Sequence, residues 1–103
     1  MNEYIILMYQ ASDNAGSPST LAAPEDWARY LGHLRSTGQF DGGSAIGDGE
    51  RVRKGLAGQP VDAALTGYLR VRAVSLQDAK ALLVGNPVYE AGGVVEIRAL
   101  LRS

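Results

Sequence analysis

The single histidine, His33, is the only side chain in this 103-residue sequence whose ordinary pKa suits proton transfer near neutral pH. On a helix it would neighbour the residues three and four positions away, which are Arg29, Tyr30, Ser36 and Thr37. None of these is a carboxylate, so an orienting partner would have to come from another part of the fold. His33 is therefore the candidate catalytic acid–base, and the alternative interpretation is an ordinary histidine on a helix surface.

Two arginines are the best candidates for binding an anion. Arg70 and Arg72 fall on one face of a predicted strand, and a guanidinium suits carboxylate or phosphate because its N–H groups are planar and paired. Tyr68 lies on the same face and completes this candidate ligand-binding set. The alternative interpretation is that the arginines form ion pairs with Glu96 or Glu50, across strands or between subunits.

The residue types do not favour a metal site, a reactive thiol or a phosphate-binding loop. The sequence has no cysteine, which excludes a disulfide, a thiol nucleophile and a thiolate metal site. Asp41, Asp48 and Asp62 fit no calcium-binding template, and no second histidine is available for a transition metal. The glycines at 42–43, 47 and 49 are not followed by the helix and lysine of a phosphate-binding loop. We therefore expect no metal and no cofactor.

Charge and hydropathy exclude two classes of partner. A net charge of −1 provides no electrostatic surface for nucleic acid or for an anionic membrane. The apolar run from Tyr4 to Tyr9 is too short for a signal sequence or a membrane span. We expect a single domain, residues 1–103, located in the cytoplasm.

The elements that must position these side chains follow from apolar periodicity and turn residues. An apolar stripe that includes Trp27 and Tyr30, both interpreted as core residues, predicts a first helix from Pro24 to Gly38. Ser75 is a good N-cap for a second helix. This second helix is expected to bury Leu76, Ala79, Leu82 and Leu83. Strands are predicted at residues 4–9, 40–46, 50–53, 68–74 and 94–101, and a loop at 55–66.

This order of elements, with two βαβ halves, predicts a ferredoxin-like α+β fold with a βαββαβ protomer, an antiparallel sheet and two helices on one face. The first strand is apolar on both of its faces, so the sheet face without helices needs a cover. A second copy of the chain, stacked sheet to sheet, would provide it. We therefore expect a homodimer.

Several short motifs along most of the chain resemble the YCII-related family, including its DGPF branch. They are Met8-Tyr9, Asp41-Gly42-Gly43, Gly67-Tyr68, Ser75-Leu76-Gln77-Asp78-Ala79, Asn86-Pro87 and Val95-Glu96-Ile97-Arg98. The resemblance implies a ferredoxin-like protomer that assembles into a dimeric α/β barrel. It does not imply one activity, because activity across the family is largely unassigned.

Some members of that family have a proposed His–Asp acid–base pair, and this sequence departs from it. The matching positions are Trp27 (or Asp26) and Asn86, and an asparagine cannot act as a general base. The resemblance therefore leaves Asp26 and Trp27 as candidate ligand-binding residues without the catalytic pair.

Two functional hypotheses follow, and the sequence leaves open whether the protein is an enzyme. The first is an accessory domain that binds a small anionic or aromatic ligand, or a partner protein, without the His–Asp pair. The alternative is a cofactor-free lyase or isomerase acting on a small aromatic or acidic molecule. In that case His33 would be the acid–base, and Arg70 and Arg72 would hold the anionic group. A purely structural dimer module is a third interpretation.

Overall fold

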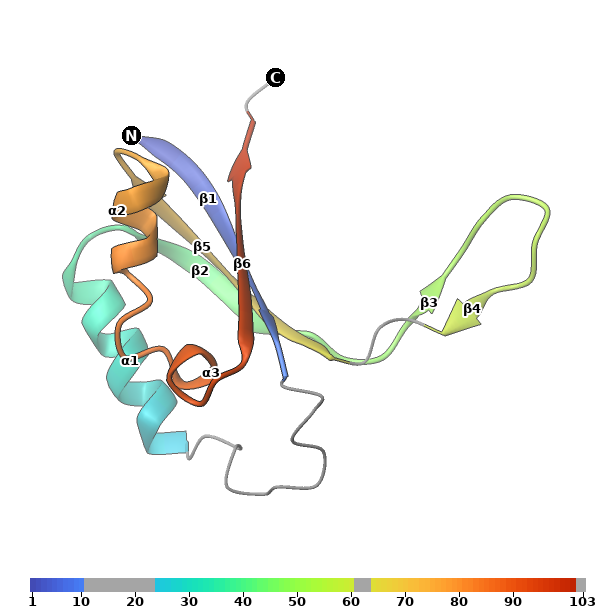
Figure 1. Ribbon diagram of the computed structural model, residues 1–103, viewed down its shortest axis with the longest axis horizontal. Helices are drawn as coiled ribbons and strands as arrows, with labels where there is room; N and C mark the ends of the chain where they lie inside the picture. The colour runs from blue at the N-terminus through green and yellow to red at the C-terminus, as the bar shows by residue number, and fades with distance from the viewer. Residues whose placement is uncertain (11–23, 61–63, 102–103) are drawn as a thin grey trace.

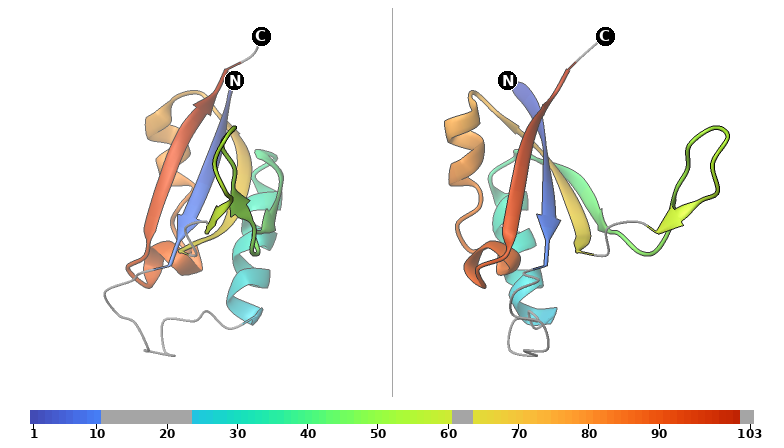
Figure 2. Two further views of the ribbon diagram at one scale, coloured as in Figure 1. Left: turned by 90° about the vertical axis from the view of Figure 1, so that its right-hand side faces the viewer. Right: turned by 45° about the vertical axis from the view of Figure 1, so that its right-hand side comes forward.

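The computed structural model describes residues 1–10, 24–60 and 64–101. An antiparallel four-stranded sheet has the strand order β2-β5-β1-β6, and the helices all lie on one of its faces (Figures 1 and 2). This is the predicted ferredoxin-like α+β arrangement. The elements are β1 (Asn2–Tyr9), α1 (Pro24–Ser36), β2 (Phe40–Ala45), β3 (Glu50–Arg51), β4 (Gln59–Pro60), β5 (Leu65–Ala73), α2 (Leu76–Ala81), α3 (Pro87–Glu90) and β6 (Val94–Leu100).

Strand alternation divides the sheet into a core face and a face opposite the helices, which we call the open face. In β1, Tyr4, Ile6 and Met8 are buried beneath the helices. The intervening residues, Ile5 and Leu7, lie on the open face and are only partly buried. The same pattern continues in β5, where Leu69, Val71 and Ala73 are buried.

The helices follow the predicted pattern with one correction. In α1, Tyr30 and Leu34 are buried, and α2 begins at the predicted N-cap, where the Ser75 hydroxyl accepts a hydrogen bond from the Asp78 amide at 3.2 Å. The prediction that the second helix buries Leu76, Leu82 and Leu83 is wrong in part: Leu76, at its start, is 49% exposed, and Leu82 and Leu83 are buried but follow the end of the helix at Ala81.

Two features between the main elements were not predicted. Residues 55–66, expected to form a loop, contain β4 and the start of β5. β3, β4 and the turn between them form a hairpin that stands away from the sheet on its open-face side (Figure 1). We call residues 46–60 the arm. The second feature is the short helix α3, which follows α2 after residues 82–86.

Candidate functional site

A pocket of about 580 Å³ lies between α1, α3 and the core face of β2 and β5, at the end of the sheet from which the arm leaves. Its walls are mainly apolar and include two aromatic rings. The apolar side chains that form them are Met8, Trp27, Leu31, Phe40, Leu69 and Val88.

The pocket exists because the sheet carries very small residues beneath α1. Gly43, Ala45 and Gly67 occupy positions of β2 and β5 that line it. A Cβ atom at Gly43 would lie 2.3 Å from the Tyr68 carbonyl oxygen, so any side chain there would force the backbone to shift. At Gly67 it would lie 3.2 Å from Met8 Cε. The close approach of the strands therefore keeps this surface free of large side chains and leaves room for a ligand.

Arg35 is the charged residue in the pocket lining. It lies in the last turn of α1, and its guanidinium carbon is 5.9 Å from the centroid of the Phe40 ring, a cation–π distance. It forms no ion pair with any residue that the structure describes. Gln10, Ser44 and Thr66 add polar groups to the lining. The arrangement combines an apolar, aromatic body with one available positive charge.

The two arginines predicted to bind an anion are held by carboxylates of the same chain. Arg70 Nη2 lies 3.6 Å from Glu3 Oε1 on the open face. Arg72 Nε lies 3.0 Å from Asp41 Oδ2, and its Nη2 donates to the Gly38 carbonyl oxygen at 2.7 Å. Neither arginine lines the pocket. The intrachain partners are thus Glu3 and Asp41, where the sequence suggested Glu96 or Glu50.

The other predicted site residues are spread over several surfaces. His33 is exposed and does not line the pocket. Asp26 forms an ion pair with Arg29 at 3.4 Å, and Trp27, next to it, does line the pocket. Tyr68 contributes to the lining, although strand alternation directs its side chain to the open face. Trp27 is therefore the predicted residue that the structure places most clearly in this site.

Asn86, at the position where the resemblance places an acid, has a structural role. It is fully buried, and its Oδ1 accepts hydrogen bonds from the amides of Val88 at 2.9 Å and Tyr89 at 3.1 Å, which caps α3. Its Nδ2 contacts Met8 Sδ at 3.5 Å. The Asn-Pro pair is the sequence signal that could have predicted α3, because asparagine favours the N-cap and proline the first helical position.

Tyr30 closes the core behind the pocket. Its hydroxyl donates to the Leu82 carbonyl oxygen at 2.8 Å, which ties α1 to the end of α2. Burial raises the pKa of Tyr30, and a hydrogen bond with Asn86 partly offsets this effect. The group stays protonated at neutral pH and acts as a donor.

Residues 1–10, 24–60 and 64–101 contain no group of three histidine, cysteine, aspartate or glutamate side chains that could hold a metal ion. No helix in this described part of the chain is long and apolar enough to cross a membrane.

Comparison with known proteins identifies the fold. No family model matches the chain, and no curated protein matches it. Among solved structures, 5-chloro-2-hydroxyhydroquinone dehydrochlorinase (TftG) from Burkholderia phenoliruptrix AC1100, in complex with 2,5-dihydroxybenzoquinone, superposes with a TM-score of 0.60 at 15% identity. The match covers 98% of this chain and 95% of that one. At this identity the likeness shows a shared fold.

Proposed function

We propose that this protein binds a small aromatic anion in the pocket between α1, α3 and the sheet. The observation that carries the proposal is an apolar cavity of about 580 Å³ with a single guanidinium, that of Arg35, in its lining. Ligand pockets of roughly 300–1,000 Å³ typically combine apolar walls with a few polar groups that orient the ligand.

The walls favour a planar ring. Trp27 and Phe40 offer aromatic surface, and rings pack well in edge-to-face or offset geometry. The existing contact between Trp27 and Tyr30 has an edge geometry, with 6.1 Å between ring centroids, which fixes the Trp27 side chain as one wall. Ligand binding would displace water from this apolar surface, and that displacement favours association.

Arg35 favours an anionic substituent on that ring. A guanidinium binds a carboxylate through two parallel N–H donors, and such charge-assisted bonds are stronger than neutral ones. Because Arg35 has no carboxylate partner among the described residues, a ligand would not have to displace one. The 2,5-dihydroxybenzoquinone held by the fold neighbour is a small ring with oxygen substituents, a size and shape compatible with this pocket.

We further propose that the chain forms a homodimer through the open face, as in the dimeric α/β barrel implied by its resemblance to the YCII-related family. The open face carries Ile5 and Leu7 of the central strand, and no helix or strand of the described chain packs over it. Arg70 with Glu3, and Arg98 with Glu96, place both charge signs on this surface. A two-fold axis can bring unlike charges together across such a face.

A thermal-shift experiment tests the ligand proposal. Benzoate and 2,5-dihydroxybenzoquinone are titrated against the protein, with benzyl alcohol as the uncharged control. A ligand at ten times its Kd stabilises the fold by about 1.4 kcal/mol, which corresponds to a rise in Tm of roughly 6 °C for a domain of this size.

The matched control variant is Ala45→Phe, which fills the pocket from the exposed strand β2. The proposal expects the shift in the wild type, a smaller shift with benzyl alcohol, and no shift in Ala45→Phe. Failure of both anions to shift the wild type, or an equal shift in Ala45→Phe, would contradict it.

A further inference from the structure

Among residues 1–10, 24–60 and 64–101, the arm is joined to the body at its base, where the Ile46 amide donates a hydrogen bond to the Thr66 carbonyl oxygen at 2.9 Å. Its two strands contain two residues each, and every residue from 47 to 60 is exposed. An isolated two-stranded hairpin of this kind is at best marginally stable in water. Val52 and Leu56 are 81% and 62% exposed, although both side chains are strongly apolar. Beyond its base, the described part of the chain therefore leaves the apolar side chains of the arm uncovered.

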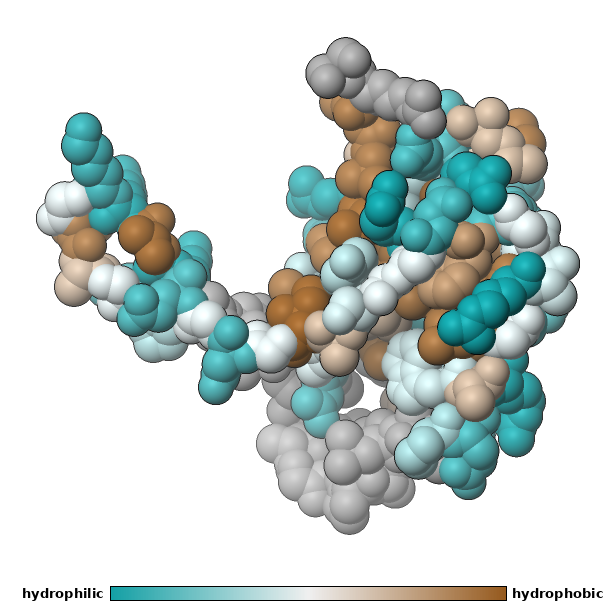
Figure 3. All heavy atoms as spheres, turned by 180° about the vertical axis from the view of Figure 1, so that it is seen from behind, coloured by the Kyte–Doolittle hydropathy of each residue, from teal (hydrophilic) through white to brown (hydrophobic). Residues whose placement is uncertain are grey.

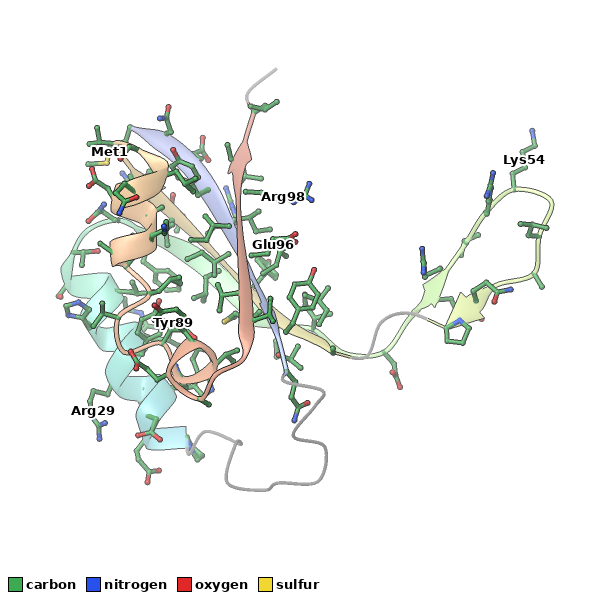
Figure 4. The ribbon with its side chains drawn as sticks, in the orientation of Figure 1. Met1, Arg29, Lys54, Tyr89, Glu96 and Arg98 are labelled. Carbon is green, nitrogen blue, oxygen red and sulfur yellow. The ribbon has the colours of Figure 1, made fainter. Side chains whose placement is uncertain are left out.

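The arm and the open face border the same space. The arm stands off the side of the sheet opposite the helices (Figures 1 and 2). Seen from behind, hydrophobic side chains lie both on the arm and on the part of the body that faces it, with open space between them (Figure 3). Glu96 and Arg98 of β6 point away from the helices into this space, and Lys54 lies at the tip of the arm (Figure 4).

We infer that the arm clasps a second copy of this chain, so that each protomer holds the other by its arm. The inference rests on the homodimer proposed above. An occupant of the space must offer a sheet-like layer with apolar residues and mixed charges, and the open face of a second copy has this composition. By two-fold symmetry both arms engage, and four apolar side chains, Val52 and Leu56 of each chain, become buried.

The first test compares two double variants by sedimentation equilibrium. Val52→Ser with Leu56→Ser removes the apolar side chains of the arm. Leu76→Ser with Val84→Ser removes exposed apolar side chains on the helix side, which are 49% and 69% exposed. The arm variant is expected to raise the Kd of the dimer by about 10,000-fold, because it removes four side chains per dimer and each buried Val or Leu contributes roughly tenfold in affinity. The helix-side variant should leave the Kd unchanged.

The second test uses the absence of cysteine from the chain. Leu56→Cys is labelled with a benzophenone maleimide and photolysed, which is expected to produce a covalent dimer with the cross-link on the second copy. Equal dimer Kd values for the two double variants, or cross-links only within one chain, would overturn the arm inference while the homodimer stands. A wild type that stays monomeric at tens of micromolar would overturn both, and the ligand proposal would be untouched.

Discussion

Replacement of Asn86 by alanine should destabilise the protein far more than loss of an ordinary helix cap. Asn86 is fully buried and its Oδ1 accepts from two backbone amides, those of Val88 and Tyr89. Loss of an N-cap costs about 1 kcal/mol, and a buried donor left without an acceptor costs about 1–3 kcal/mol more. The free energy of unfolding should therefore fall by about 2–4 kcal/mol, a large part of the 5–15 kcal/mol typical of a small domain.

Urea unfolding followed by circular dichroism measures this change, with two variants for comparison. Ser75→Ala removes the cap of α2, which lies nearer the surface and has one such hydrogen bond, so it should cost about 1 kcal/mol. Asn86→Asp keeps the acceptor oxygens, so its free energy of unfolding should lie between that of wild type and that of Asn86→Ala. An Asn86→Ala variant within about 0.5 kcal/mol of wild type, the range of an ordinary surface change, would refute the argument that this buried cap holds α3 against the core.

Three further predictions concern the pocket and its supports. Arg35→Met should weaken benzoate binding by about tenfold or more, the effect of one charge-assisted contact, and leave benzyl alcohol binding unchanged in calorimetric titrations. Gly43→Ala should lower the free energy of unfolding by about 1–3 kcal/mol through overpacking, because its Cβ would approach the Tyr68 carbonyl oxygen to 2.3 Å; urea unfolding at wild-type midpoint would contradict this. The raised pKa of Tyr30 means that its contribution to stability is complete below the unfolded value near pH 10 and is lost as pH rises further. The fall in Tm between pH 9 and pH 11 should accordingly be smaller in Tyr30→Phe, and an equal fall in the two proteins would contradict the assignment.

The fold could be predicted from local patterns because the decisive residues are close in sequence. Alternation in residues 68–74 predicts β5, and the Ser75 cap predicts the start of α2. The alternation also assigns Arg70 and Arg72 correctly to the open face. Their partners could not be predicted, because these depend on strand register. The register between β2 and β5 shifts at a bulge between Phe40 and Gly42. Asp41, the partner of Arg72, lies at this bulge.

The sequence did not predict the pocket, because the pocket forms where glycines leave space beside the sheet. In the sequence, Gly43 only counted against a phosphate-binding loop and Gly67 only formed part of a family motif. The pairing of β2 with β5 is what places both glycines in the pocket lining. Arg35 was not among the residues predicted to bind an anion. Arg70 and Arg72 were chosen because both fall on one face of the same predicted strand. Trp27 was interpreted as a core residue by its spacing; it is only partly buried, and it packs against the core while also lining the pocket.

Fluorescence of Trp27 provides the most direct test of the central claim, because it is the single tryptophan of the chain and it lines the pocket. Titration with benzoate is predicted to change its emission saturably in the wild type and in the surface variant His33→Ala. Arg35→Met should require higher ligand concentrations, and Ala45→Phe should show no saturable change. A wild type without a saturable change, or an Ala45→Phe variant that titrates like the wild type, would contradict the assignment of this pocket as the site for a small aromatic anion.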